Sequence, residues 1–249
     1  MAPLGACAAP YKCPPAPSEA ALLLDDYLTT RGVRAQCDIT LVLPFPAPVP
    51  PSPETSVALV KAFAARNITY VPNRRVIAIE ATETLGSAAV LDDGTALPCD
   101  LFLGIPKHCA PPVVEASGLA ENGWIPVNPR TLETKCSGVY AIGDVSNTGT
   151  PKGGVFAEGA ARAVASSLIA RIGGAGQPEP FAGAGSCYVE MGGGQVGRVD
   201  VDFFSGPKPT GVFSRGVRRP SRREGAVRCQ SAETVVRVLA RGHPTHHSP

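Results

Sequence analysis

The sequence predicts an α/β protein whose residues 11–105 form a parallel sheet with helices between its strands. An apolar strand, a helix and a second apolar strand follow one another between residues 38 and 71, which is the repeating unit of such a sheet. Hydrophobic residues make up 44% of the 249 residues, enough for a packed core. The 26 prolines and 27 glycines indicate many turns between short elements.

The first helix is predicted to end at Arg31, after a proline-rich loop that begins at Tyr11. Its apolar residues recur on one face, Ser18 is the expected N-cap, and Gly32 follows as the stop signal. The apolar run at residues 38–43 ends at prolines and is expected to be a buried parallel strand.

A second helix is predicted from Ser52 to about Arg66, because the six prolines of residues 44–53 exclude regular structure before it. Residues 68–71 then return as a strand. The rest of this region is expected to contain an antiparallel excursion at residues 75–81 and 87–91, a tight turn at Asp93 and Gly94, and a further buried strand at residues 100–105.

After residue 106 the pattern changes to loop and short helix as far as Trp124. A strand is then predicted at residues 138–144, followed by the best-defined helix of the chain at residues 153–172. Two strands, at residues 187–191 and 196–204, are expected to form a β-hairpin around three glycines. The run Gly192-x-Gly194-x-x-Gly197 matches a dinucleotide-binding pattern in letters only, because a strand rather than a helix follows it.

The net charge of +2 is unevenly distributed. Residues 214–249 carry eight arginines and two glutamates, a net +6, so that the preceding 213 residues carry −4. This basic tail has no aromatic residue and no helical periodicity, so we expect it to be disordered and not to bind nucleic acid.

The composition disfavours several classes of protein. The first ten residues lack the basic and apolar segments of a secretory signal, and no stretch approaches the ~20 apolar residues of a membrane span. Eight cysteines without a Cys-x-x-Cys pair indicate neither a disulfide scaffold nor a zinc site, and His108 with Cys109 lacks metal-ligand spacing. A cytoplasmic protein is expected, with the inner face of a membrane as an alternative place of attachment.

The first candidate site surrounds Gly143 and Asp144. An apolar strand that ends at Asp144 delivers a carboxylate to the edge where open α/β sheets bind ligands. The next helix opens with Lys152, Gly153 and Gly154, so its free N–H groups and positive dipole end can face the same ligand. A carboxylate there can accept hydrogen bonds from the ribityl hydroxyls of a flavin, and a helix start suits the ring edge that becomes negative on reduction. The alternative is a structural aspartate in an ordinary strand–turn–helix.

The second candidate is Cys13, in the run Ala9-Pro-Tyr-Lys-Cys-Pro-Pro-Ala-Pro17. A nicotinamide-binding domain would carry Gly-x-Gly-x-x-Gly at this turn, whereas the four prolines here remove N–H donors and add bulk. A thiol beside Lys12 and a helix start is expected to have a lowered pKa. The alternative is a buried structural cysteine.

Residues 134–144 resemble the second flavin-binding motif of the pyridine nucleotide-disulfide oxidoreductase superfamily. Residues 101–108 and 123–134 narrow the resemblance to sulfide:quinone oxidoreductases and flavocytochrome c sulfide dehydrogenases. The similarity covers about residues 5–213. It implies a Rossmann-like, two-domain FAD/NAD(P)-binding flavoprotein fold, of which this chain is a part without the amino-terminal FAD-binding segment.

The resemblance also implies the cofactor and its contacts. FAD would be bound largely by a neighbouring segment, with Asp144 at the ribityl chain and Lys152 and the helix start near the pyrimidine edge. The run around Cys13 resembles Tyr-Arg-Cys-Pro-Pro-Gly-Pro of flavocytochrome c sulfide dehydrogenases, whose cysteine is half of a redox-active disulfide. Cys187 is the matching candidate, with a small apolar strand residue as the alternative. The remaining cysteines are expected to be structural: Cys7, Cys37, Cys99, Cys109, Cys136 and Cys229.

In this interpretation the chain has four regions. Residues 1–105 form a second, NAD-type dinucleotide-binding domain, and residues 106–180 form the carboxyl-terminal part of an FAD-binding domain. Residues 181–213 form the hairpin, and residues 214–249 form the basic tail.

The function implied is oxidation of sulfide or a related sulfur compound, with electrons passing through the flavin to a quinone or a cytochrome. One alternative is an NAD(P)H-dependent flavin reductase, which the prolines at the phosphate turn disfavour. Another is a truncated, non-catalytic remnant that binds no flavin alone. Since the sequence lacks the first flavin-binding motif of its relatives, we expect either a truncated product or a partner chain that supplies this segment.

Overall fold

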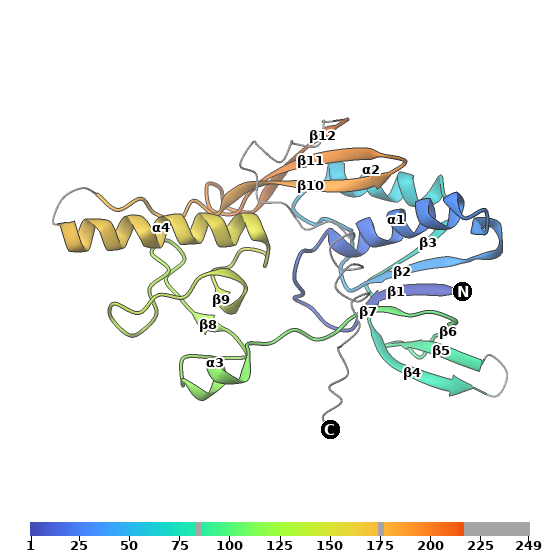
Figure 1. The fold of residues 1–249 in the computed structure, drawn as a ribbon, viewed down its shortest axis with the longest axis horizontal. Coiled ribbons are helices and arrows are strands. Elements are labelled where there is room, and N and C mark those ends of the chain that lie inside the picture. The colour runs from blue at the N-terminus through green and yellow to red at the C-terminus, as the bar shows by residue number, and fades with distance from the viewer. Residues whose placement is uncertain (83–85, 174–176, 217–249) are drawn as a thin grey trace, which may run out of the picture. The chain divides into compact units, whose positions relative to one another are not determined.

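The structure, a computed structural model, describes residues 1–82, 86–173 and 177–216 (Figure 1). Its helices are α1 (Ala16–Thr30), α2 (Pro53–Ala64), α3 (Pro112–Ala116) and α4 (Gly154–Gly173). Its strands are β1 (Ala2–Ala6), β2 (Ile39–Leu43), β3 (Ile68–Pro72), β4 (Val76–Thr82), β5 (Gly86–Leu91), β6 (Ala96–Pro98), β7 (Leu103–Ile105), β8 (Ile125–Pro126), β9 (Ser146–Asn147), β10 (Ala184–Gly192), β11 (Gln195–Asp202) and β12 (Thr210–Arg215). Short 3-10 turns occupy Arg34–Gln36 and Gly143–Val145.

The predicted parallel sheet is confirmed, with strand order β3-β2-β1-β7. One of its two inner strands, β1, for which no residue range was predicted, is buried along its whole length. Leu4 aligns with Leu41 on one side and with Leu103 on the other. The chain runs β1–α1–β2–α2–β3, so the turn after β1 opens at the carboxyl edge of the sheet, where such folds bind ligands.

Helix α2 begins as predicted, because the Ser52 side chain accepts a hydrogen bond from the Thr55 N–H. The predicted N-cap of α1 was wrong. This helix starts at Ala16, and Ser18 lies inside its first turn, fully buried and with no hydrogen-bond partner for its Oγ among the described residues. Proline presets a backbone φ close to the helical value, so Pro15 and Pro17 allow the helix to start before the serine.

The antiparallel excursion is confirmed by the pairing of β4 with β5, and β6 extends it into a three-stranded sheet. Gly94 adopts a positive φ of 86° in the predicted tight turn, which the bond from the Leu91 N–H to the Thr95 carbonyl closes. The strand expected at residues 100–105 forms in part, as β7, but the expectation that it is buried was wrong. β7 is three residues long and pairs only with β1 among the described strands, and Leu101 and Leu103 are exposed.

The predicted strand at residues 138–144 is also corrected. The described chain forms only an isolated bridge between Glu133 and Tyr140 there, followed by the 3-10 turn Gly143–Val145. Val139 and Ile142 are exposed. An extended apolar segment becomes a strand when neighbouring strands take up its backbone groups, and no described strand lies beside this one.

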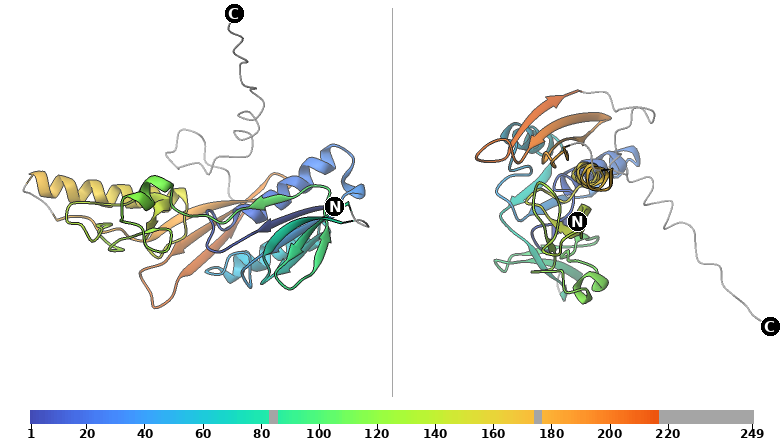
Figure 2. Two further views of the ribbon diagram at one scale, coloured as in Figure 1. Left: turned by 90° about the horizontal axis from the view of Figure 1, so that it is seen from below. Right: turned by 90° about the vertical axis from the view of Figure 1, so that its left-hand side faces the viewer.

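The carboxyl-terminal hairpin is confirmed as β10 and β11, and β12 adds a third strand that was not predicted. Gly192, Gly193 and Gly194 all have positive φ, so the Gly-x-Gly-x-x-Gly match is a hairpin turn. The antiparallel sheet packs against α1 through β10 and against α2 through β12, and both views in Figure 2 show it beside these helices.

Helix α4 matches the predicted long helix, and its Phe156 joins the core cluster that contains α1 and β2 side chains. No helix in the described part of the chain is long and apolar enough to cross a bilayer. The basic tail lies almost wholly outside the described residues.

Candidate functional site

Cys13 lies in the turn between β1 and α1. Its φ is +51°, a left-handed conformation that costs a non-glycine residue about 1–2 kcal/mol. Its carbonyl accepts a hydrogen bond from Ala16 at 2.9 Å, and the preceding Tyr11 is almost fully buried with its ring 5.5 Å from that of Phe45. Tertiary contacts therefore hold this turn in a conformation that a free peptide would rarely adopt.

Two contacts tie this turn to the flavin-motif residues, and a third ties it to His108. The Cys13 N–H donates to the Lys152 carbonyl at 2.7 Å, and the Lys12 N–H donates to His108 Nδ1 at 3.0 Å. The Lys12 ammonium lies 3.3 Å from the Asp144 carboxylate. The structure thus brings together three of the predicted site residues, Cys13, Asp144 and Lys152.

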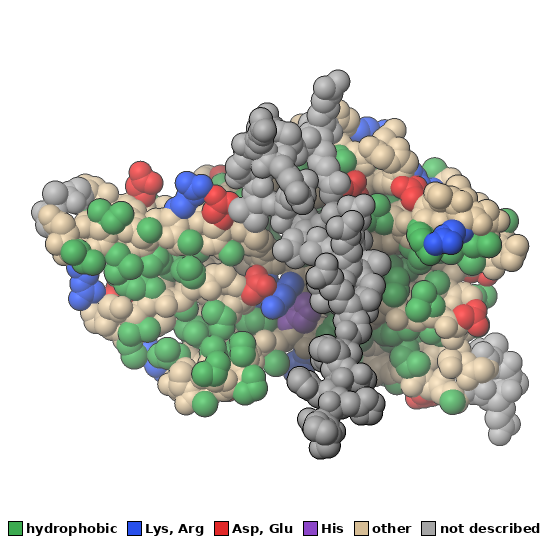
Figure 3. Space-filling view, viewed as in Figure 1, with side chains coloured by type: hydrophobic (Ala, Val, Ile, Leu, Met, Phe, Trp, Pro, Cys, Tyr) green, Lys and Arg blue, Asp and Glu red, His purple; other side chains and the backbone are tan. Residues whose placement is uncertain are grey.

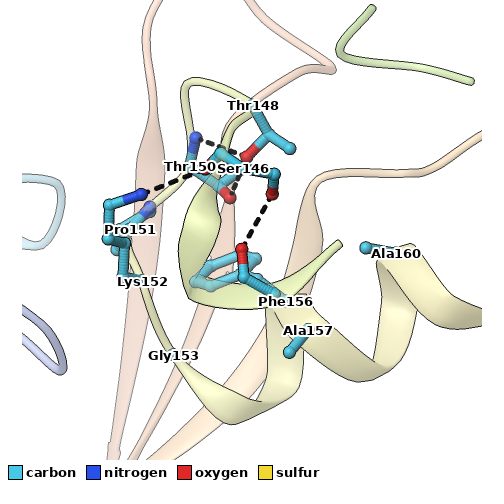
Figure 4. A pocket seen from close by; sticks show the side chains of 10 residues that line it. Ser146, Thr148, Thr150, Pro151, Lys152, Gly153, Phe156, Ala157 and Ala160 are labelled. Carbon is cyan, nitrogen blue, oxygen red and sulfur yellow. Dashed lines mark hydrogen bonds between the residues drawn. The ribbon is translucent and has the colours of Figure 1, made fainter. Parts of the chain in front are cut away.

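Lys152 has an unusual environment for a lysine. Its ammonium donates to the Ser146 carbonyl at 3.0 Å (Figure 4). It also lies 3.7 Å from the centre of the Trp124 ring. Burial lowers the pKa of Lys152 below its usual range, while the charge of Asp144 opposes this shift and that of Lys12 adds to it. A partly dehydrated ammonium exerts a stronger field on a neighbouring anion than one in bulk water.

A small cavity adjoins the start of α4, lined by Ser146, Thr148, Thr150, Lys152 and Phe156 among others (Figure 4). Its volume is about 10 Å³, which is room for one water molecule. The hydroxyls of Thr148 and Thr150 are hydrogen-bonded to each other at 2.8 Å beside it. A flavin ring does not fit in this cavity, so any flavin contact made here involves groups on the surface around it.

The surface groups fit the ribityl and pyrimidine parts of FAD. Asp144 offers an acceptor for hydroxyls, and Lys152 with the start of α4 offers donors for an anionic ring edge. The Lys12–Asp144 pair is well exposed, with side chains 46% and 39% accessible, so it contributes about 0–1 kcal/mol and hydroxyl groups can replace it. Gly143 and Gly154, also predicted, lie beside Asp144 and at the first position of α4.

Cys187 lies on β10, opposite Val199 of β11. Its face of the strand is that of Val189, which is buried in the core cluster with Ala21 and Leu22 of α1. Cys187 is therefore directed to the side of the strand on which α1 lies.

Two contacts fix how β10 runs along α1. The Glu190 N–H donates to the Glu19 carboxylate at 2.9 Å, and the Gly193 N–H donates to the Asp26 carboxylate at 2.7 Å. The strand and the helix therefore run in the same direction. Cys187 lies three residues back along the strand from Glu190, about 10 Å. Glu19 lies one turn inside α1, and Cys13 lies in the turn three residues before the start of this helix at Ala16. We infer that Cys187 and Cys13 lie near the same end of α1; the distance between their sulfurs stays a prediction.

Sequence reasoning missed three contributions to this site. His108 was considered only as a metal ligand, Trp124 only as the end of a loop, and Lys12 only as a neighbour of Cys13. The resemblance in residues 101–108 and 123–134 includes both aromatic side chains, but nothing local indicates that they meet Lys12 and Lys152.

Among the cysteines expected to be structural, Cys99 is buried, and burial raises the pKa of Cys7. Cys109 and Cys136 are exposed, so they do not contribute to a core. Cys229 lies outside the described residues.

A family model described as pyridine nucleotide-disulphide oxidoreductase matches residues 19–166. The sulfide:quinone oxidoreductase of the hyperthermophilic bacterium Aquifex aeolicus shares the fold with a TM-score of 0.69 and 22% identity, over 86% of this chain and 54% of its own. The ferredoxin reductase for the CYP199A2 system of Rhodopseudomonas palustris matches with a TM-score of 0.53 and 22% identity, over 82% of this chain and 47% of its own. A chain of the Tetrahymena thermophila mitochondrial ATP synthase matches with a TM-score of 0.61 and 14% identity, over 81% of this chain and 50% of its own. The chain spans about half the length of these proteins, and at such identities the likeness shows the fold alone.

Proposed function

Because this chain belongs to the pyridine nucleotide-disulphide oxidoreductase family, we propose that it is part of an FAD-dependent oxidoreductase that oxidises sulfide or a related sulfur compound through Cys13 and Cys187. Members of the family bind FAD. The flavin, when bound, supplies a two-electron acceptor that can pass its electrons to a quinone or a cytochrome. One protein with this fold is named as a sulfide:quinone oxidoreductase.

The observation that carries the proposal is the hydrogen bond from the Cys13 N–H to the Lys152 carbonyl. Through this bond the backbone of the candidate reactive cysteine is joined directly to the residue proposed for the flavin edge. Lys152 and Asp144 occupy the start of α4 and the turn before it, so a thiol, two ammonium groups and a carboxylate gather in one region. Such a group of residues suits the attack of an anion on a sulfur.

In the proposed reaction, hydrosulfide attacks one sulfur of a Cys13–Cys187 disulfide. The bond between the two cysteine sulfurs breaks, one cysteine keeps the added sulfur as a persulfide, and the other leaves as a thiolate. Lys12 and Lys152 favour the approach of the anion and stabilise the thiolate. The Trp124 ring covers one side of the Lys152 ammonium and keeps water from it.

The same contacts disfavour the alternative of NAD(P)H binding. A pyrophosphate in the turn after β1 needs free backbone N–H groups. The amides of Lys12 and Cys13 already donate to His108 and Lys152, and Pro14 and Pro15 have no N–H.

We further propose that a flavin-binding segment covers an apolar face formed by α4 and the loop before it. Val139, Ile142, Ile169 and Ile172 are exposed there, and hydrophobic side chains gather over α3 and α4 in the left part of Figure 3. Contiguous exposed apolar residues mark interaction surfaces. The segment would supply the strands that residues 138–144 lack as neighbours and the site for the ADP half of FAD.

Without that segment, the 249-residue chain is expected to bind FAD weakly or not at all. Its Asp144 and Lys152 reach only one part of the cofactor, and the adjoining cavity takes one water molecule. Equilibrium dialysis of the purified chain against FAD measures this directly. Tight, stoichiometric binding would contradict the need for a further segment.

In the protein completed by that segment, Asp144→Ala is expected to weaken FAD binding. One charged hydrogen bond of about 1.5–3 kcal/mol is lost, which corresponds to a rise in Kd of roughly 10- to 150-fold. Equilibrium dialysis gives the Kd of each variant. Asp92→Ala, which removes an aspartate paired with Arg75 in the β4–β5 region, is the matched control and should leave the Kd unchanged. Equal Kd values for the two variants would show that Asp144 does not contribute to FAD binding.

A further inference from the structure

The turn that carries Cys13 is held by a hydrogen bond that depends on the protonation state of His108. The Lys12 N–H donates to His108 Nδ1 at 3.0 Å. An imidazole nitrogen accepts a hydrogen bond only when it carries no proton, so the ring is neutral and its proton lies on Nε2. Protonation at Nδ1 would place one donor against another.

This bond and the one from Cys13 act on consecutive residues. The Lys12 amide is held by His108, and the Cys13 amide is held by the Lys152 carbonyl at 2.7 Å. Cys13 has a left-handed φ and is followed by Pro14, so few backbone conformations are open to it. The two anchors therefore decide where the Cys13 side chain lies relative to Lys152.

We propose that neutral His108 is a positioning residue for Cys13, which holds the Lys12–Cys13 turn against the flavin-motif residues and releases it on protonation. The inference rests on the proposed function, in which Cys13 reacts with a sulfur compound. It gives that reaction an acid limb that belongs to a residue acting through the backbone of the Lys12–Cys13 turn.

The surroundings of His108 favour its neutral form, which accepts the hydrogen bond from the Lys12 N–H, at neutral pH. The charges of Lys12, on the cysteine turn, and of Asp144, on the 3-10 turn, act on the ring, and Lys107 precedes it in the sequence. The charge of Asp144 also acts on Lys152. Burial lowers the pKa of His108 below its usual value of 6.5, the charge of Lys12 lowers it further, and Asp144 opposes both. A lowered pKa means that the ring is neutral at pH 7, so the bond is present there and is lost as the pH falls.

The test uses two variants of the full chain. His108→Asn places an amide oxygen close to the position of Nδ1, so it can accept the same bond but does not titrate; His108→Leu has no acceptor. Hydrogen exchange of the Lys12 amide, followed by NMR and corrected for its intrinsic pH dependence, reports the bond. Between about pH 7.5 and about pH 5 the wild-type protection factor should fall roughly tenfold, the Asn variant should stay constant, and the Leu variant should be low throughout.

Protection that does not change with pH in the wild type, or that falls equally in the Asn variant, would overturn the inference. The pH profile of sulfide-dependent flavin reduction in the completed protein is a separate readout. An acid limb in the wild type that is absent from the Asn variant supports the role in positioning Cys13. A further outcome is that the protection of the Lys12 amide falls with pH as expected while sulfide reduces the flavin of neither the wild type nor a variant. In that case the proposed function fails and the positioning contact stands.

Discussion

Cys13→Ser should abolish sulfide-dependent flavin reduction in the completed protein, by at least about a thousandfold, while FAD remains bound. Serine keeps the backbone N–H that donates to Lys152, so the turn is preserved, but its oxygen cannot form the persulfide. The measurement is the loss of flavin absorbance on anaerobic addition of sulfide, together with the flavin content of the purified variant.

Cys187→Ser should have the same effect, because both cysteine sulfurs are needed for the exchange. Cys37→Ser is the matched control, since Cys37 follows the Arg34–Gln36 turn at the amino end of β2, the end of the strand away from the site, and the flavin of this variant should be reduced by sulfide like that of the wild type. Retained reduction in Cys13→Ser would show that the chemistry lies elsewhere in the protein.

The pairing itself can be tested without activity. A disulfide requires Cα atoms within about 7 Å, and from the parallel course of β10 and α1 we infer that the two cysteines lie near the same end of α1. Peptide mapping of the oxidised, unreduced protein should recover Cys13 linked to Cys187. Linkage of either cysteine to the exposed Cys109 or Cys136 as the main product would argue against the pair.

Asp25→Ala should lower the free energy of unfolding by about 3–5 kcal/mol. The carboxylate of Asp25 is buried on α1, where it pairs with Arg34 and, at 3.4 Å, with Arg66. Arg34 is itself fixed by the carbonyls of Cys37, Arg66 and Asn67, so it cannot easily turn to solvent when its counter-charge is removed. The variant leaves two partly buried guanidinium groups without this carboxylate.

Urea denaturation followed by circular dichroism measures the change. Asp38→Ala, which removes an exposed aspartate just before β2, is the control and should change stability by no more than about 0.5 kcal/mol. A loss below about 1 kcal/mol for Asp25→Ala would show that the two arginines find other partners or water.

This cluster also bears on the site. Asp26, the neighbour of Asp25, accepts the Gly193 N–H at the hairpin turn, and Glu19 accepts the Glu190 N–H closer to Cys187. Asp25 joins α1 to the chain around Arg34 and Arg66. A loosened α1 would therefore also change where β10 carries Cys187.

The sequence by itself determined the elements whose signals are local. The Ser52 cap, the Asp93-Gly94 turn, the three-glycine hairpin and the long helix after Gly153 each depend on neighbouring residues, and all were predicted correctly. The order strand–helix–strand was enough to predict a parallel sheet, because short connections leave few other topologies.

Tertiary structure alone decided what depends on distant partners. Residues 138–144 have the composition of a strand but no described strand to pair with, and β7 is exposed because it lies at an edge. His108 meets Lys12 across 96 residues, and Trp124 meets Lys152 through ring and ammonium contacts that no local pattern encodes. Side-chain periodicity reports which face of an element is buried, whereas the site is formed by segments that only the packing of the sheet, α4 and the loops between them brings together.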